Sequence, residues 1–244
     1  MNNLEQVIVI SLKSSKERRE VFSKLNKHVD YVYFDAVVGA ELDDSITKNE
    51  SIFSKNLNFN KGAMGNALSH ISLWRYCVEN DCSLTVAEDD CFFREDFHLI
   101  KSKLLGNENS DWDLISWGWN FDSPIYLNIL KNISDISLFA NQDQLRINTN
   151  KFLECKEFPK ILPLRYSCGL PAYSITPTGA KKFLENCLPL SNINRYSGDV
   201  FNNIGLDLSM STVYPYTNSF VCLPPIAGTH NSKLDSSANP DVKR

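Results

Sequence analysis

The first forty residues contain the pattern that most restricts the fold of this chain. An apolar, β-branched run at residues 6–12 is followed by the charged stretch KERREVFSKLNK and then by a second strand-like run at residues 29–37. Ser14 and Glu17 have the spacing of a capping box, which predicts the start of the intervening helix. A strand, a helix and a strand in this order usually form a parallel, right-handed unit. The sequence therefore predicts an α/β protein.

Further segments extend this pattern along the chain. Apolar residues recur near helical spacing over residues 62–80, and the apolar run SLTVA at residues 83–87 predicts a buried strand. Thr176 and Pro177 supply an N-cap and a first-turn proline for the helix TGAKKFLENC. Additional strand candidates lie at residues 113–117, 168–176, 211–216 and 220–225.

The length and organisation of the chain favour one domain over residues 1–244. A chain of 244 residues can bury one substantial core, and it contains no internal repeat and no obvious linker. Residues from about 122 to 160 are polar, and we expect them to be irregular. Long stretches of this kind in a compact domain are usually functional or mobile. We therefore expect an insertion or lid there.

Charge and cysteine content restrict the partners and the compartment. The formal net charge of −4 provides no basic surface for a nucleic-acid backbone, although a small phosphorylated ligand is compatible with it. The N-terminal segment has no basic region, and its apolar run is too short for a signal peptide or a membrane span. The seven cysteines form no C-x-x-C pair, which favours reduced thiols. These features predict a cytoplasmic protein.

Three consecutive acidic residues, Glu88, Asp89 and Asp90, directly follow the strand predicted at residues 83–87. In open α/β sheets, ligands bind outside the carboxyl ends of the strands. In an extended segment Glu88 and Asp90 project to the same side, so both could bind one hard cation. The alternative is an acidic turn without a ligand.

The helix predicted at residues 62–80 begins with small residues, which let another group approach its free N–H groups. His70 shares a face with Asn66 and Trp74, which is compatible with a polar contact in a cleft. A buried, hydrogen-bonding histidine is the alternative. The sequence lacks GxGxxG, GxxxxGK[ST], GxSxG and HExxH, so carboxylate and metal chemistry in an α/β protein remains.

Five ordered blocks resemble glycosyltransferase family 25: VISLKSSKERR, FDAVVG, KGAMGNALSHISLWR, LTVAEDD and LPAYSITPTGAKKFLENC. The resemblance implies a GT-A fold, a Rossmann-like mixed sheet flanked by helices, with the insertion at about 122–160 on the acceptor side. It also implies an inverting transferase that moves a hexose, expected to be galactose, from a UDP-sugar to a lipooligosaccharide hydroxyl. Contact with the inner face of the inner membrane follows from such an acceptor.

The resemblance also assigns candidate site residues. Glu88, Asp89 and Asp90 match the metal-binding acidic motif. Within it, Glu88 and Asp90 are expected to bind Mn²⁺ or Mg²⁺, and Asp89 and Asp90 to take part in catalysis. His230 resembles a C-terminal histidine that many GT-A enzymes add to the metal shell. Asp199 is our candidate for the general base, although it could instead begin a helix. The expected donor-binding residues are Ser11, Leu12, Arg18, Arg19, Phe34, Asp35, Ala36, Gly65, Ser69, His70 and Asp89.

Two other functions are compatible with the sequence alone. An acidic cluster at a strand end also serves metal-dependent phosphohydrolases and nucleotidyltransferases, which release phosphate or pyrophosphate and not a nucleoside diphosphate. A non-catalytic glycan-binding protein could use the same fold.

Overall fold

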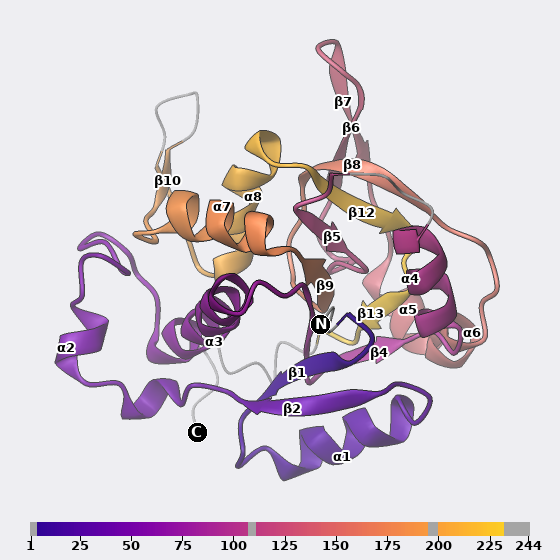
Figure 1. The fold of residues 1–244 in the computed structure, drawn as a ribbon, viewed down its shortest axis with the longest axis horizontal. Coiled ribbons are helices and arrows are strands. Elements are labelled where there is room, and N and C mark those ends of the chain that lie inside the picture. The colour runs from indigo at the N-terminus through magenta and orange to yellow at the C-terminus, as the bar shows by residue number, and fades with distance from the viewer. Residues whose placement is uncertain (1–3, 107–110, 195–199, 232–244) are drawn as a thin grey trace.

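The structure is a computed structural model that describes residues 4–106, 111–194 and 200–231. Its centre is a nine-stranded mixed sheet with helices on both faces (Figure 1). In spatial order the strands are β2 (Tyr31–Asp35), β1 (Val7–Ser11), β3 (Leu84–Glu88), β9 (Ala172–Ile175), β5 (Leu114–Ser116), β12 (Ser219–Leu223), β8 (Lys160–Tyr166), β6 (Ile125–Leu130) and β7 (Ser134–Leu138). Strands β2, β1 and β3 are parallel, whereas β9 is antiparallel to both β3 and β5. The predicted α/β class is confirmed, and the arrangement is compatible with a GT-A type fold.

The remaining elements cover the sheet or close its edges. The helices are α1 (Lys16–Leu25), α2 (Asp44–Thr47), α3 (Lys61–Glu79), α4 (Phe97–Gly106), α5 (Gln142–Ile147), α6 (Thr149–Leu153), α7 (Pro177–Cys187) and α8 (Leu206–Val213), with 3₁₀ turns η1 (Gly39–Glu41) and η2 (Tyr214–Tyr216). Two small antiparallel pairs join β10 (Ile193–Asn194) to β11 (Val200–Phe201) and β4 (Cys91–Phe93) to β13 (Ala227–Thr229).

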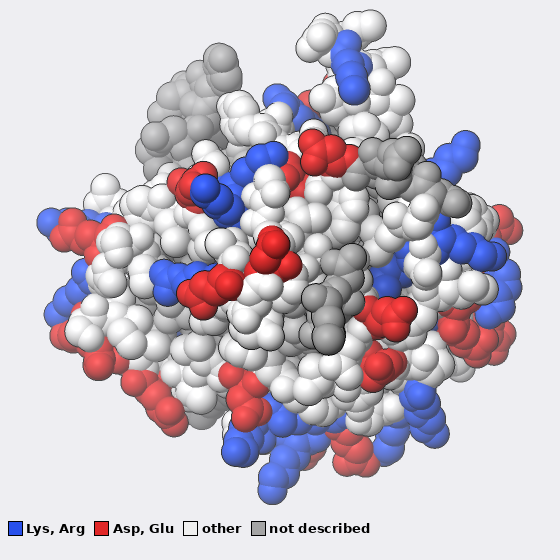
Figure 2. All heavy atoms as spheres, in the orientation of Figure 1, with Lys and Arg blue, Asp and Glu red and all other residues white. Residues whose placement is uncertain are grey.

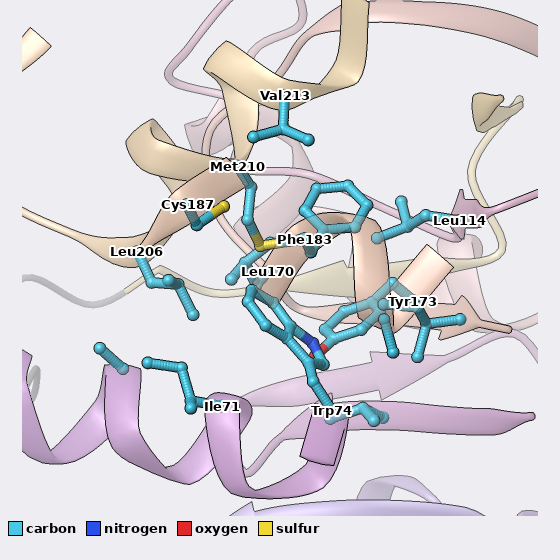
Figure 3. Packing of buried hydrophobic residues seen from close by; sticks show 14 of the residues in the cluster. Ile71, Trp74, Leu114, Leu170, Tyr173, Phe183, Cys187, Leu206, Met210 and Val213 are labelled. Atoms are coloured by element: carbon cyan, nitrogen blue, oxygen red, sulfur yellow. The ribbon is translucent and has the colours of Figure 1, made fainter. Parts of the chain in front are cut away.

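Two hydrophobic clusters lie on opposite faces of the sheet because side chains alternate along each strand. Val7 and Val9 of β1 pack in one cluster with Phe22 of α1 and Phe97 of α4. Ile10 belongs to the other cluster, which includes residues of α3, α7 and α8. Figure 3 shows part of this second cluster. The fold therefore has three layers, with the sheet between two layers of helices.

Close backbone packing fixes the start of α3 against the segment after β2. A Cβ atom on Gly65 would lie 2.6 Å from the carbonyl oxygen of Val37, so only glycine fits this contact. Ser69 Oγ accepts a 2.9 Å hydrogen bond from the backbone N–H of Val37. The Asn60 side chain caps the helix by accepting from the N–H of Ala63. These contacts place the first turns of α3 beside the carboxyl end of β2.

Three local predictions were wrong. Helix α1 begins at Lys16 with Ser15 at the N-cap and no side-chain cap, because Ser14 belongs to the preceding turn and not to a capping box. The segment at about 122–160 is not irregular, since it contains β6, β7, α5 and α6, and β6 pairs with β8 at the end of the large sheet. The run at residues 211–216 is helical, because buried Leu206, Met210 and Val213 have helical spacing.

Other sequence expectations concern the surface and the cysteines. All seven cysteines lie in the described ranges, and none of them is disulfide-bonded there. Within those ranges we find no helix whose length and apolar character would let it cross a membrane. Acidic and basic side chains are interspersed on the face shown in Figure 2.

Candidate functional site

The carboxyl ends of β2, β1 and β3 lie side by side. Ser11 pairs with Asp35 of β2, and the preceding Ile10 pairs with Glu88 of β3. Since β2 and β3 lie on opposite sides of β1, the order of the strands reverses here, and this is where open α/β sheets bind ligands. The predicted residues Ser11, Asp35 and Glu88 are therefore brought to one edge.

Asp89 is held by β1 and α1. The chain leaves β3 after Glu88 and turns at Asp89 and Asp90, so the expected extended conformation of the triplet does not hold. Asp89 is buried and accepts a 2.7 Å hydrogen bond from Ser11 Oγ. Its other oxygen is paired with the guanidinium of Arg18. These partners fix the turn.

Glu88 is oriented by two side chains of α3. Its Oε1 accepts a 2.9 Å hydrogen bond from Asn66 and lies 3.5 Å from Nε2 of His70. Burial alone would raise the pKa of Glu88, but the hydrogen bonds from His70 and Asn66, together with the charge of Arg18, hold the pKa below its usual value. These neighbours therefore favour the charged form of Glu88.

Asp90 is the least compensated carboxylate of the triplet. Its Oδ1 is buried and has no hydrogen-bond partner in the structure. Burial, reinforced by the charge of Glu88, raises the pKa of Asp90 to about 7 despite a hydrogen bond from Thr229 and the charge of Arg18. A buried carboxylate oxygen without a donor is costly unless a cation or proton compensates it. The Asp90 side chain as a whole is 34% exposed, so its second oxygen is more accessible than the unpartnered Oδ1.

The two adjacent arginines of α1 have different environments. Arg18 pairs with Asp89, and its guanidinium lies 3.7 Å from Asp90. Arg19 instead contacts Ser11 and forms a 2.7 Å salt bridge with Asp35. Its guanidinium also lies over the ring of Tyr33. Arg18 is therefore part of the acidic site, whereas Arg19 links the ends of β1 and β2.

His230 directly follows Thr229, which bonds to Asp90, but its own side chain has other partners. Its Nε2 lies 3.0 Å from Oγ1 of Thr149, and its ring packs against Phe92. Burial and the charge of Arg146 lower the pKa of His230. Among the described residues there is no group of three His, Cys, Asp or Glu side chains arranged to hold a metal ion. By their chemistry, the carboxylates of Glu88 and Asp90 are the type of ligand that hard divalent cations favour.

The other predicted donor-binding residues surround the ends of β1 and β2. Leu12, Phe34 and Ala36 are half-buried, and the N–H of Ala36 donates to the carbonyl oxygen of Ser11. Ser69 and His70 are fully buried and have protein partners. Asp199 falls outside the described residues.

Two residues beyond our predicted set contribute to the site. Asn66 donates a hydrogen bond to Glu88. The sequence predicted only that Asn66 and His70 share one face of a helix, and the structure confirms this. Thr229 reaches Asp90 because β13 pairs with β4 and sets Thr229 opposite Cys91. No local pattern in the sequence indicates this long-range pairing.

Comparison with known proteins identifies the family. Residues 4–199 match the sequence profile described as "Glycosyltransferase family 25 (LPS biosynthesis protein)". The chain belongs to glycosyltransferase family 25. This family 25 chain is 26% identical over 190 residues to a "Putative glycosyltransferase" of Haemophilus influenzae, a match that covers 75% of the chain and 58% of that protein.

The family 25 chain also shares sequence similarity with mammalian proteins. The chain is 25% identical over 197 residues to the mouse "Inactive glycosyltransferase 25 family member 3", across 75% of the chain and 29% of the mouse protein. It thus matches only part of the length of both relatives. One solved structure, "Crystal Structure of A197 from STIV", aligns with a TM-score of 0.39 and 14% identity over 88% of the chain and 80% of that structure.

Proposed function

We propose that this family 25 chain is an active, inverting transferase that moves galactose from a UDP-sugar to a hydroxyl of a lipooligosaccharide glycan. Family membership supports sugar transfer and lipopolysaccharide biosynthesis in general. The choice of galactose and of inversion comes from the resemblance of the sequence blocks. Release of a nucleoside diphosphate would distinguish this function from a phosphohydrolase or nucleotidyltransferase.

The buried Oδ1 of Asp90 is the single observation on which this proposal most depends. It has no hydrogen-bond partner, and it lies next to two other carboxylates at the strand edge. Three carboxylates with one nearby arginine would repel a diphosphate unless a cation intervened. A divalent cation would bind the Oδ1 atom that lacks a hydrogen-bond donor and would neutralise the negative charge of the diphosphate.

We assign Glu88 and Asp90 as the protein ligands of Mn²⁺ or Mg²⁺. The metal would neutralise the charge that develops on the departing diphosphate. His230 would first have to give up its 3.0 Å contact with Thr149, so we propose only two protein ligands for the initial complex.

The chain's own residues supply the remaining needs of the reaction. Arg18 adds a positive charge beside the acidic site, and Asp89 with Ser11 keeps that arginine and the turn in place. In an inverting transfer the acceptor hydroxyl must lose a proton to a base on the opposite face of the sugar. We retain Asp199 as the proposed base because it lies in a polar segment between predicted elements.

The acceptor side is proposed to involve the β6–β7 hairpin, which projects from the body of the protein (Figure 1). We further propose that the protein works in the cytoplasm, in peripheral contact with the membrane where a lipid-linked acceptor is built.

A panel of UDP-sugars tests the proposed function. The purified chain is incubated with each sugar and Mn²⁺, and free UDP is quantified. We expect UDP-galactose to give the fastest release, with loss of at least 100-fold in Asp90→Asn. Absence of UDP release from every sugar, with and without a lipooligosaccharide acceptor, would contradict an active transferase and favour a non-catalytic role.

A further inference from the structure

A second set of polar groups lies behind Glu88, inside the core. Asn66, His70 and Trp74 are spaced four residues apart on α3 and therefore form one stripe on the helix. Asn66 and His70 both approach Oε1 of Glu88. The remaining polar atoms of the stripe converge on the hydroxyl of Tyr173 in β9. Nδ1 of His70 lies 2.9 Å from this hydroxyl, and Nε1 of Trp74 lies 3.0 Å from it.

Bulk solvent does not reach this group. His70 and Trp74 are 0% exposed and Tyr173 is 1% exposed. Figure 3 shows the indole nitrogen of Trp74 and the hydroxyl of Tyr173 directed toward each other between α3 and the sheet. Every hydrogen-bond donor in such an environment needs an acceptor within the protein, because an unsatisfied buried donor costs about 1–3 kcal/mol.

The donors and acceptors available in this group determine which atoms of Tyr173 and His70 carry protons. The indole N–H of Trp74 can only donate, so it donates to the Tyr173 oxygen. The hydroxyl proton of Tyr173 then has the Nδ1 lone pair of His70 as its acceptor. His70 therefore has its own proton on Nε2 and directs it toward Oε1 of Glu88.

The alternative protonation states satisfy fewer groups. With the proton on Nδ1, the Nε2 lone pair of His70 would face the carboxylate of Glu88, and the hydroxyl of Tyr173 would lose its acceptor. A doubly protonated His70 would still leave that hydroxyl proton without its acceptor. The neutral Nε2–H form alone satisfies Trp74, Tyr173 and His70 together.

We propose that Tyr173 and His70 are positioning residues that act through Glu88: Tyr173 selects the Nε2–H tautomer of His70, and His70 with Asn66 fixes the carboxylate of Glu88. This inference deepens the proposed function and rests on it. It replaces the expectation that His70 contacts the donor directly. Both donors converge on Oε1, and we assign the other oxygen of Glu88 to the cation. Groups that orient a metal ligand typically contribute 10- to 100-fold to metal affinity or activity.

The matched pair of variants is Tyr173→Phe and Tyr214→Phe. Both tyrosines are buried in the same hydrophobic cluster, but Tyr214 belongs to η2 and its hydroxyl bonds to Ser167. Each variant removes one buried hydroxyl, so a general loss of stability affects both. Only Tyr173→Phe removes the group that selects the tautomer.

The first measurement is the tautomer of His70, read by long-range ¹H–¹⁵N correlation in metal-free protein labelled at its four histidines. The signals of His70 are assigned by their loss in His70→Gln. We expect protonated Nε2 and unprotonated Nδ1 in the wild type and in Tyr214→Phe, and a mixture of tautomers in Tyr173→Phe. A proton on Nδ1 in the wild type would overturn the proposal, and this result needs no variant to fold.

The second measurement is the affinity for Mn²⁺ alone, by calorimetric titration. We expect 10- to 100-fold weaker binding in Tyr173→Phe and wild-type affinity in Tyr214→Phe. Equal affinities in the two variants would overturn the positioning role. If the wild type shows the expected tautomer but neither binds Mn²⁺ nor releases UDP, the proposed function fails while the hydrogen-bond arrangement around Glu88 is retained.

Discussion

Ser11 and Asp89 lie 78 positions apart in the sequence, yet Ser11 Oγ donates a 2.7 Å hydrogen bond to Oδ2 of Asp89. This bond ties the end of β1 to the turn that follows β3. Arg18 holds the other oxygen of Asp89. The turn after β3 is therefore fixed by β1 and α1 of the opening β-α-β unit. Asp90, which follows Asp89 in this turn, has a buried Oδ1 atom without a hydrogen-bond donor.

Removing the charge of Arg18 should have opposite effects on the metal and on the donor. In Arg18→Met, the loss of a positive charge 3.7 Å from Asp90 should strengthen Mn²⁺ binding on the order of tenfold. The KM for the UDP-sugar should rise on the order of tenfold, since a charge-assisted contact to phosphate is lost. Calorimetry and initial rates measure the two effects. Lys24→Met, which removes an exposed charge on the same helix, should change neither.

Replacing Gly65 should separate α3 from the end of β2. The added Cβ of Gly65→Ala would lie 2.6 Å from the Val37 carbonyl oxygen and 2.8 Å from the Gly39 nitrogen, so the backbones must move apart. We expect a loss of about 1–3 kcal/mol in the free energy of unfolding, measured by urea denaturation. Gly106→Ala is the control, because its added Cβ would meet no atom within 4 Å apart from its chain neighbours and the backbone of its own helix. Equal stabilities of the two variants would show that the close contact is absent.

Lys101 should give the protein a stability component that depends on pH. Its ammonium is buried, donates to the carbonyl oxygen of Leu4 and lies 3.4 Å from Thr85 Oγ1, and burial lowers its pKa to about 8. The unfolded chain binds this proton up to the ordinary lysine pKa of about 10.4, so the folded state loses it first as pH rises. The buried lysine thus destabilises the fold below pH 8, and this cost is relieved between about pH 8 and 10.4.

The test compares wild type with Lys101→Met across this range. The wild type should gain up to about 3 kcal/mol of unfolding free energy relative to the variant as pH rises from 8 to 10.4. The difference between the two proteins isolates Lys101, since buried cysteines such as Cys77 titrate in both. A difference that does not change with pH would mean that Lys101 keeps an ordinary pKa.

The β6–β7 hairpin should matter for transfer but not for donor hydrolysis. Ile129, Leu130 and Ile133 are 45%, 45% and 81% exposed, so serine at all three positions should change the unfolding free energy by less than about 1 kcal/mol. We expect unchanged hydrolysis of UDP-galactose in water and at least tenfold slower transfer to a lipooligosaccharide acceptor. Leu99→Ser, an exposed position on α4, is the control. Parallel loss of both activities would argue against an acceptor-side role.

The local sequence predicted the elements whose signals lie within one segment. The β-branched run of β1, the proline at the start of α7 and the Asn66, His70 and Trp74 stripe of α3 are such signals, and the structure confirms each. The strand at residues 83–87 was predicted correctly, so Glu88 was correctly placed at a strand end.

The remaining features depend on contacts between distant segments. Consecutive residues on a helix point about 100° apart, so whether Arg18 or Arg19 faces the acidic site is decided only by how α1 packs on the sheet. Thr229 meets Asp90 only because β13 pairs with β4. The polar segment near residues 122–160 becomes ordered because β6 finds a partner in β8, which its own composition does not indicate.

The binding of UDP with and without Mn²⁺, measured by calorimetric titration of wild type and Asp90→Asn, tests the central claim most directly. We predict that Mn²⁺ strengthens UDP binding at least tenfold in the wild type and has no effect in Asp90→Asn, whose thermal unfolding should still be cooperative. Equal UDP affinity with and without Mn²⁺ in the wild type would contradict a cation held by Glu88 and Asp90.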